Sequence, residues 1–178
     1  APLSVSRESS VRLIDDSVLT SDRIVGMVAQ RKPHTDQPGF DDVFEVGCAA
    51  IIRTLVKLPD NVRLIVQGIQ RFRIVERIQE TPFLKARIEL IDEIEVPEEQ
   101  REEVEALRRS VAGLFEQAVR LSPNMPEELR SLTTAVQETS SMADLVAAHM
   151  NLPLADKQTI LEKLDLRERL RSLLDMIS

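Results

Sequence analysis

The sequence feature that most constrains the fold is a long β-hairpin pattern over residues 45–78. Two strand-length runs rich in Val, Ile and Leu flank the tetrapeptide Leu58-Pro59-Asp60-Asn61. Proline pre-sets φ for the first turn position, and Asp and Asn tolerate the left-handed and bridge conformations that can follow. The pattern therefore predicts two long antiparallel strands joined by a tight turn, with the rest of a sheet built around them.

Apolar residues recur at every second position in both predicted strands, which predicts that one face of the sheet is buried. Arg71, Arg73 and Arg77 fall on the other parity, so we expect a solvated basic stripe there. Gly68 interrupts the second strand, and an interior strand glycine usually marks a bulge or a bend that curls a sheet. The apolar parity consists of Val46, Cys48, Ala50, Ile52, Val56 and Leu58, then Val62, Leu64, Val66, Phe72, Ile74 and Ile78.

The flanking segments predict more strands and one helix. Spacings of three and four residues predict a helix over residues 6–19, and a continuous apolar run predicts a buried strand over 24–29. Two prolines and a glycine make residues 31–42 a loop, and alternation predicts another strand over 83–92. Four or more strands with a bend-forming glycine predict a small barrel or a strongly coiled sheet.

Beyond residue 95 the apolar residues recur at spacings of three and four, which is the period of an α-helix. The longest pattern, from Val104 to Leu121, predicts an amphipathic helix of about six turns. Further helices are expected from Pro126, from a capping-box pattern at Ser141, from Ala155 and from Asp165. We therefore expect an α+β chain with a β-barrel unit over residues 1–94 and an all-α helical bundle over 95–178.

The patterns at the two ends of the sequence predict elements that continue beyond it. Residues 1–5 resemble the end of a strand that began earlier, and no glycine or proline closes the last helical pattern. That last pattern is a stripe that could pair with a neighbouring subunit. Its members are Leu166, Leu170, Leu173, Leu174 and Ile177.

Composition narrows the classes of partner. Aromatic residues make up 3% of the chain, with no Trp or Tyr, so the aromatic platforms that stack nucleic-acid bases are disfavoured. Residues 1–94 hold 13 basic and 14 acidic residues, and residues 95–178 hold 10 and 16, giving net charges of −1 and −6. Neither half has the basic balance of a phosphate-backbone binder, so nucleic acid is not an expected partner.

The single cysteine excludes an internal disulfide and suits a reducing compartment. No signal-peptide pattern opens the chain, and no apolar run approaches the roughly 20 residues of a membrane span. These features predict a cytoplasmic protein, or a fragment of one, that has no membrane partner.

No motif for catalysis or metal binding is present. None of the five glycines begins a P-loop, and Cys48, His34 and His149 are too few to build a structural zinc site. Cys48 lies on the apolar parity of a strand, where a free cysteine is usually a small buried hydrophobe. We expect His149 to be a packing residue and His34 to be solvated. The chain is therefore predicted to hold no catalytic residue, no metal and no cofactor.

Eight short motifs in chain order resemble the N-terminal domain of Lon, the ATP-dependent protease, over nearly the whole sequence. Cys48 stands where the family pattern has Thr, Asn61 where it has Gly, and Gln67 where it has Glu. The motifs are Val28-Ala29-Gln30, Glu45-Val46-Gly47-Cys48-Ala49-Ala50, Leu58-Pro59-Asp60-Asn61, Val66-Gln67-Gly68-Ile69-Gln70-Arg71, Pro82-Phe83-Leu84-Lys85-Ala86, Met142-Ala143-Asp144, Lys157-Gln158 with Leu161-Glu162, and Arg169-Leu170.

The resemblance implies a PUA-like barrel, lacking its first strand here, followed by a helical bundle. It implies recognition of unfolded, damaged or degron-bearing protein substrates and a part in organising a hexamer with neighbouring subunits. The family's ATPase module, which uses ATP and Mg, and its Ser-Lys protease dyad would lie outside this chain. The segment itself is then not an enzyme.

From the residues we expect substrate to bind in an apolar groove between barrel and bundle, because clefts between domains are frequent binding places. Two alternatives stay open: a stand-alone protein-interaction or self-association module, and an RNA-binding PUA-like domain, against which the acidic balance argues. The candidate substrate contacts are Phe40, Phe44 and Phe83 from the barrel and Met125, Met142 and Met150 from the bundle.

Overall fold

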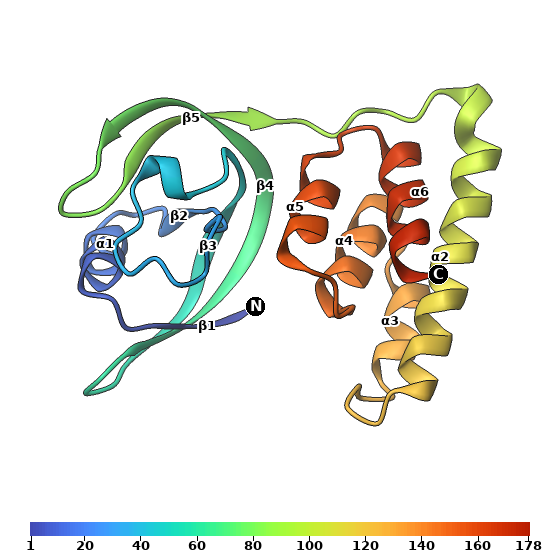
Figure 1. Cartoon of the computed structure of the whole chain (residues 1–178), viewed down its shortest axis with the longest axis horizontal. Coiled ribbons are helices and arrows are strands. Elements are labelled where there is room, and N and C mark those ends of the chain that lie inside the picture. The colour runs from blue at the N-terminus through green and yellow to red at the C-terminus, as the bar shows by residue number, and fades with distance from the viewer. The chain divides into compact units, whose positions relative to one another are not determined.

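A computed structural model describes all 178 residues, which form two compact units, Ala1–Asp92 and Glu93–Ser178 (Figure 1). The first unit contains a five-stranded antiparallel sheet and one α-helix, and the second contains only helices. The α+β class predicted from the sequence is confirmed. No helix in the chain is both long and apolar enough to cross a bilayer.

The sheet of the first unit is built on the predicted hairpin. Its strands pair in the order β1-β4-β3-β2, and β5 pairs with the second half of β4. β3 and β4 are long and strongly curved (Figure 1). The elements are β1 (Pro2–Val5), α1 (Glu8–Val18), β2 (Ile24–Met27), a 3-10 turn (Phe40–Asp42), β3 (Val46–Lys57), β4 (Val62–Gln79) and β5 (Lys85–Ile91).

Helix α1 packs on one face of this sheet and forms a core with β2, β3 and β4. The members of this core share aliphatic side chains, as the lack of aromatics required. They are Ile14, Val25, Ala50, Ile52, Val62, Leu64 and Val66, with Leu3, Val5, Val11, Leu13, Val18, Met27 and Leu55 partly buried around them.

A bulge lies where Gly68 predicted it, and it changes which parity of β4 faces this core. Ala50 pairs with Gly68 but Ala49 pairs with Gln70, so Ile69 is an extra residue. The predicted single apolar parity is therefore wrong beyond Gly68. Arg71 turns to the face of Cys48 and is only 8% exposed, so the expected solvated stripe is wrong for Arg71 as well.

The same bulge sends Phe72 to the opposite face of the sheet. Its ring is buried and lies over two glycines, Gly26 and Gly47, where no side chain intervenes. The sheet thus buries residues on both faces, which a strict period of two does not predict.

A second bulge in β3 explains a further error of parity. Ile52 pairs with Val66 and Thr54 pairs with Ile65, which leaves Arg53 as the extra residue. Leu55 then packs on the α1 core, whereas Val56, predicted to be buried, is 49% exposed.

The hairpin turn forms at the predicted residues but without a left-handed residue. The Leu58 N–H donates to the Asn61 carbonyl oxygen at 2.8 Å. Arg23, with φ of 52°, is the one residue in the chain with a positive φ, so the left-handed conformation expected at Asn61 is absent. The turn therefore does not depend on the glycine that the family pattern has at this position.

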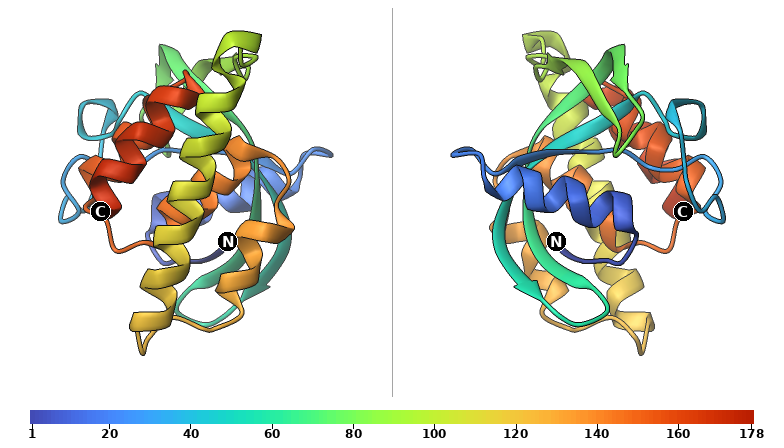
Figure 2. Two further views of the ribbon diagram at one scale, coloured as in Figure 1. Left: turned by 90° about the vertical axis from the view of Figure 1, so that its right-hand side faces the viewer. Right: turned by 90° about the vertical axis from the view of Figure 1, so that its left-hand side faces the viewer.

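The second unit is a bundle of five helices. A 3-10 turn (Glu98–Gln100) leads into α2 (Arg101–Leu121), and Figure 2 shows α6 lying beside α2. Asp165 caps α6 by accepting from the Glu168 N–H, but α4 begins before Ser141, so the capping box predicted there is wrong. The remaining helices are α3 (Leu129–Ala135), α4 (Thr139–His149), α5 (Leu154–Glu162) and α6 (Leu166–Ile177).

The apolar stripe of α6 belongs to the core of its own bundle. Leu170 and Leu173 are fully buried, and the other stripe residues pack against them. The stripe is therefore not free to pair with a neighbouring subunit, as the self-association hypothesis required. The buried core consists of Val104, Val111, Phe115, Val119, Met142, Ala143, Val146, Ala147, Ile160, Leu170 and Leu173.

Replacing Gly68 with Val is expected to lower the free energy of unfolding by about 1–3 kcal/mol, the usual cost of overpacking. A Cβ at this position would lie 3.1 Å from the Cys48 Sγ. Urea denaturation followed by far-UV circular dichroism measures the loss. Adding Cys48→Ala is expected to restore part of it, because the crowded sulfur is then gone. A fully stable Gly68→Val variant that has lost only ligand binding would contradict a structural role.

Candidate binding site

The three predicted aromatic contacts all lie in the first unit, and they differ in exposure. Phe40 is 6% exposed, and the Arg77 guanidinium lies 5.6 Å from the centre of its ring. Phe44 is half-buried under Arg31, at 4.7 Å, and Phe83 is half-buried in the segment before β5. Phe40 is therefore a packing residue, whereas Phe44 and Phe83 keep surface that a ligand could contact.

The three predicted methionines all lie in the bundle. Met142 is fully buried in the core, and Met125 and Met150 pack on that core while remaining partly exposed. Residue type alone could not distinguish these two situations, because the same flexible side chain serves as core filler and as binding surface.

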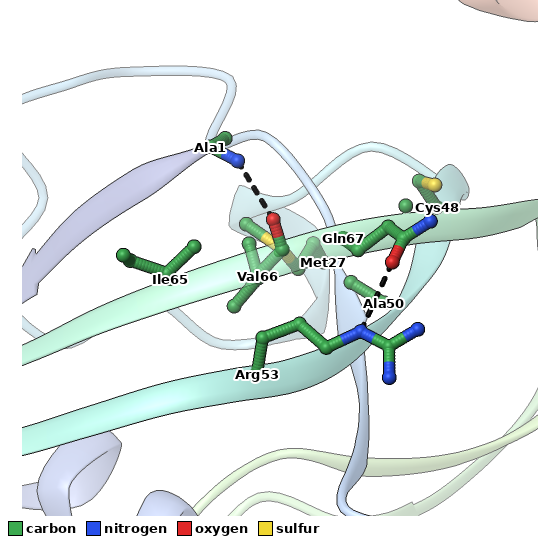
Figure 3. A pocket seen from close by; sticks show the side chains of 9 residues that line it. Ala1, Met27, Cys48, Ala50, Arg53, Ile65, Val66 and Gln67 are labelled. Carbon is green, nitrogen blue, oxygen red and sulfur yellow. Dashed lines mark hydrogen bonds between the residues drawn. The ribbon is translucent and has the colours of Figure 1, made fainter.

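The first unit carries an apolar hollow that residue types did not predict (Figure 3). It is an open depression with a volume of about 550 Å³ beside β4 at the Gly68 bulge. Gly68 and Ala50 leave it open, since a larger side chain at either position would fill it. Its lining is Ala1, Met27, Cys48, Ala50, Arg53, Ile65, Val66, Gln67 and Gly68.

Polar contacts fix the rim of the hollow. The Arg53 Nε donates to the Gln67 Oε1 at 3.0 Å, and the Ala1 nitrogen donates to the Val66 carbonyl oxygen at 2.7 Å (Figure 3). Ile65, on the rim, is 50% exposed, and Ile69, the bulged residue, is 54% exposed. The hollow therefore combines an apolar floor with exposed aliphatic side chains beside it.

Two strands share one edge of β4 beside the hollow. β1 pairs with β4 as far as Ile65, and β5 pairs with the same edge from Arg71 onward.

The hollow brings no acid–base or metal-binding chemistry together. Cys48 is half-buried and its Sγ lies 3.3 Å from the Ala49 carbonyl oxygen. No group of three or more His, Cys, Asp and Glu residues that could hold a metal ion occurs in the chain. His149, expected to pack, lies exposed on α4 with its Nδ1 2.9 Å from the Leu145 carbonyl oxygen. What the site offers is apolar surface.

Two solved structures of Lon N-terminal domains share this fold. The N-terminal domain of a Mycobacterium avium complex Lon protease matches with a TM-score of 0.78 at 18% identity, covering 99% of this chain and 89% of that one. A Lon N-terminal domain protein from Xanthomonas campestris matches with a TM-score of 0.61 at 15% identity, covering 98% and 88%. At these identities the likeness establishes the fold.

The family follows from the sequence comparisons. The family model for the ATP-dependent protease La (LON) substrate-binding domain matches residues 1–178, and the chain belongs to this family. Lon protease 2 of Myxococcus xanthus is 36% identical over 178 residues, which are 99% of this chain and 21% of that protein. The Lon protease of Dictyoglomus thermophilum is 39% identical over 171 residues, 96% of this chain and 21% of that protein. The chain thus spans about a fifth of the length of these relatives.

Proposed function

We propose that this substrate-binding domain captures extended apolar segments of unfolded or damaged proteins at the hollow beside β4. The observation that carries the proposal is the coincidence of two features at Gly68: an apolar hollow and the exposed side chains of Ile65 and Ile69. Native proteins hide most of their aliphatic side chains, so a site that binds such side chains distinguishes an unfolded chain.

Binding would rest on apolar contacts. Aliphatic side chains of an extended segment would enter the hollow, where Met27 and Cys48 offer polarizable, adaptable surface. Such contacts tolerate many sequences and select those with aliphatic residues.

The double variant Ile65→Thr/Ile69→Thr is expected to bind an unfolded aliphatic peptide about tenfold more weakly, a loss of about 1.4 kcal/mol. Threonine keeps the β-branch that suits a strand but replaces the ethyl group of isoleucine by a hydroxyl. Fluorescence anisotropy with a labelled peptide of alternating Val and Ser measures the affinity. The peptide must be unstructured on its own, which circular dichroism checks.

The matched control is Leu19→Thr/Leu121→Thr, which removes two apolar side chains that are 84% and 82% exposed and lie outside the hollow. Its affinity should equal that of the parent chain. An equal loss in both double variants would mean that any exposed aliphatic residue attracts the peptide, and the proposed site would be wrong. Crosslinking of the same peptide to the chain tests the remaining predicted contacts, which are Phe44, Phe83, Met125 and Met150.

The rest of the assignment concerns the longer protein. We infer that it is a cytoplasmic ATP-dependent serine protease in which a separate module uses ATP and Mg, a Ser-Lys dyad cuts the peptide bond, and several copies assemble as a hexamer. The family membership supports this inference, because the matched relatives carry the name Lon protease. Detection of an ATPase P-loop in the coding sequence downstream of residue 178 tests it directly.

A further inference from the structure

The outer edge of β5 has no partner strand. β5 pairs with β4 along one edge, and no strand pairs with its other edge (Figure 1). On this strand Ile88 is 40% exposed and Leu90 is 53% exposed. An unpaired edge of seven residues presents a row of N–H and C=O groups to any strand that can match it.

The sequence of β5 complements itself when two copies run antiparallel about Ile88. In that register Arg87 faces Glu89 of the second copy, and Glu89 faces Arg87 of the second copy. On the opposite face of the strand, Ala86 meets Leu90 of the second copy, and Ile88 meets its own equivalent. Opposite charges therefore meet at the centre of one face, flanked by Lys85 opposite Ile91, and apolar side chains meet on the other face, which stabilises cross-strand pairs.

The charges of β4 extend this complementarity. Within one chain Glu89 pairs with Arg73, and Arg87 pairs with Glu76, whose Oε2 lies 2.7 Å from the Arg87 Nε. Two copies joined at β5 would carry two symmetric rows of four side chains in which the sign alternates. Each row contains Arg73 and Glu89 of one copy, then Arg87 and Glu76 of the other.

We propose that two copies of this chain associate by antiparallel pairing of their β5 edges, centred on Ile88. Charged residues at an edge strand normally prevent association, because a random partner does not match them. Here the order Arg87-Ile88-Glu89 makes the chain's own copy the partner that does match. The contact is isologous and two-fold, so it joins chains in pairs. It is separate from the capture of unfolded segments and does not depend on it.

The test uses a pair of charge reversals in the whole 178-residue chain. Sedimentation velocity should show a weak monomer–dimer equilibrium for the parent chain, strongest at low ionic strength, since the contact is small and charged. Arg87→Glu and Glu89→Arg should each lower the association constant about tenfold or more, because both symmetric contacts become repulsive. An equimolar mixture of the two variants should restore the dimer, since the acidic strand of one variant then faces the basic strand of the other at both contacts.

The control is Arg109→Glu, which changes the net charge of the chain as Arg87→Glu does. Arg109 lies on α2, where it pairs with Glu105. It should associate like the parent chain. Circular dichroism verifies that each variant is folded, as expected for exposed positions. A parent chain that stays monomeric at millimolar concentration overturns the proposal. So does a dimer that survives the single reversals, or a mixture that does not recover. Peptide anisotropy on the same samples reports substrate capture separately.

Discussion

Replacing Gly47 with alanine should destabilise the first unit by about 3 kcal/mol or more, at the upper end of what overpacking costs. A Cβ at this position would lie 2.2 Å from the Met27 carbonyl oxygen, 2.6 Å from the Val28 Cγ1 and 2.9 Å from the Phe72 Cζ. The first of these atoms is backbone in β2, which the ladder to β3 holds in place, so it cannot move aside as a flexible side chain would. Either the β2–β3 pairing or the Phe72 ring must shift.

The measurement must separate the two units, because the compact units of one chain need not unfold in a single two-state transition. The chain has no Trp or Tyr, so urea denaturation is followed by far-UV circular dichroism, and hydrogen exchange of the β3 amides locates the loss. The β3 amides should lose protection in Gly47→Ala while those of α2 keep it.

Gly113→Ala is the matched control, with the opposite expected sign. A Cβ at Gly113 would meet nothing within 4 Å, and the residue lies exposed inside α2. Because alanine favours a helix interior by about 1 kcal/mol over glycine, this variant should stabilise the bundle slightly. If Gly47→Ala proved as stable as the parent chain, the close approach of β2, β3 and Phe72 would be refuted.

The sequence predicted the elements well where a local signal specified them. The helical spacing placed the start of α6 near Asp165, as the structure has it, and the interruption at Gly68 predicted the bulge in β4. The prediction failed where one extra residue in a strand reversed which of the following side chains face the core. The Ile69 bulge buried Arg71 and moved Phe72 to the other face, and the Arg53 bulge exposed Val56. Arg53 carries no local mark, because any residue type can occupy a bulge of this kind.

The candidate site could be predicted only in part, for a related reason. Phe40 and Met142 were chosen by residue type, yet tertiary packing buries both. The hollow at Gly68 exists because small residues from β3 and β4 lie opposite each other, which depends on register between strands. The glycine was visible in the sequence, but its pairing with Ala50 was not.

Replacing Arg169 with alanine should destabilise the bundle by about 3 kcal/mol, from the cavity and from lost hydrogen bonds. Arg169 is completely buried on α6. Its Nε donates to the Lys163 carbonyl oxygen at 2.8 Å, and its Nη1 donates to the Ser140 Oγ at 2.6 Å. Its Nη2 lies 3.6 Å from the Glu93 Oε2, and the Ser140 hydroxyl donates to the other Glu93 oxygen at 2.9 Å.

Most of that loss should come from the hydrogen bonds and the packing rather than from the ion pair. The Glu93 side chain is 45% exposed, so water can solvate its carboxylate once the arginine is gone. The Ser140 hydroxyl and the Lys163 carbonyl would instead lose a donor inside the bundle. Arg169→Lys should therefore recover less than half of the stability, since one ammonium cannot reach three acceptors as the planar guanidinium does.

Arg171→Ala provides the comparison that decides between burial and charge. Arg171 lies on the same helix and pairs with Glu103, but its side chain is 53% exposed. Exposed pairs contribute about 0–1 kcal/mol, so this variant should lose far less stability in urea than Arg169→Ala. Equal losses would mean that charge alone matters. A much larger loss for Arg169→Ala would establish that the burial of this side chain and its hydrogen bonds to Ser140 and Lys163, rather than its charge, stabilise the bundle.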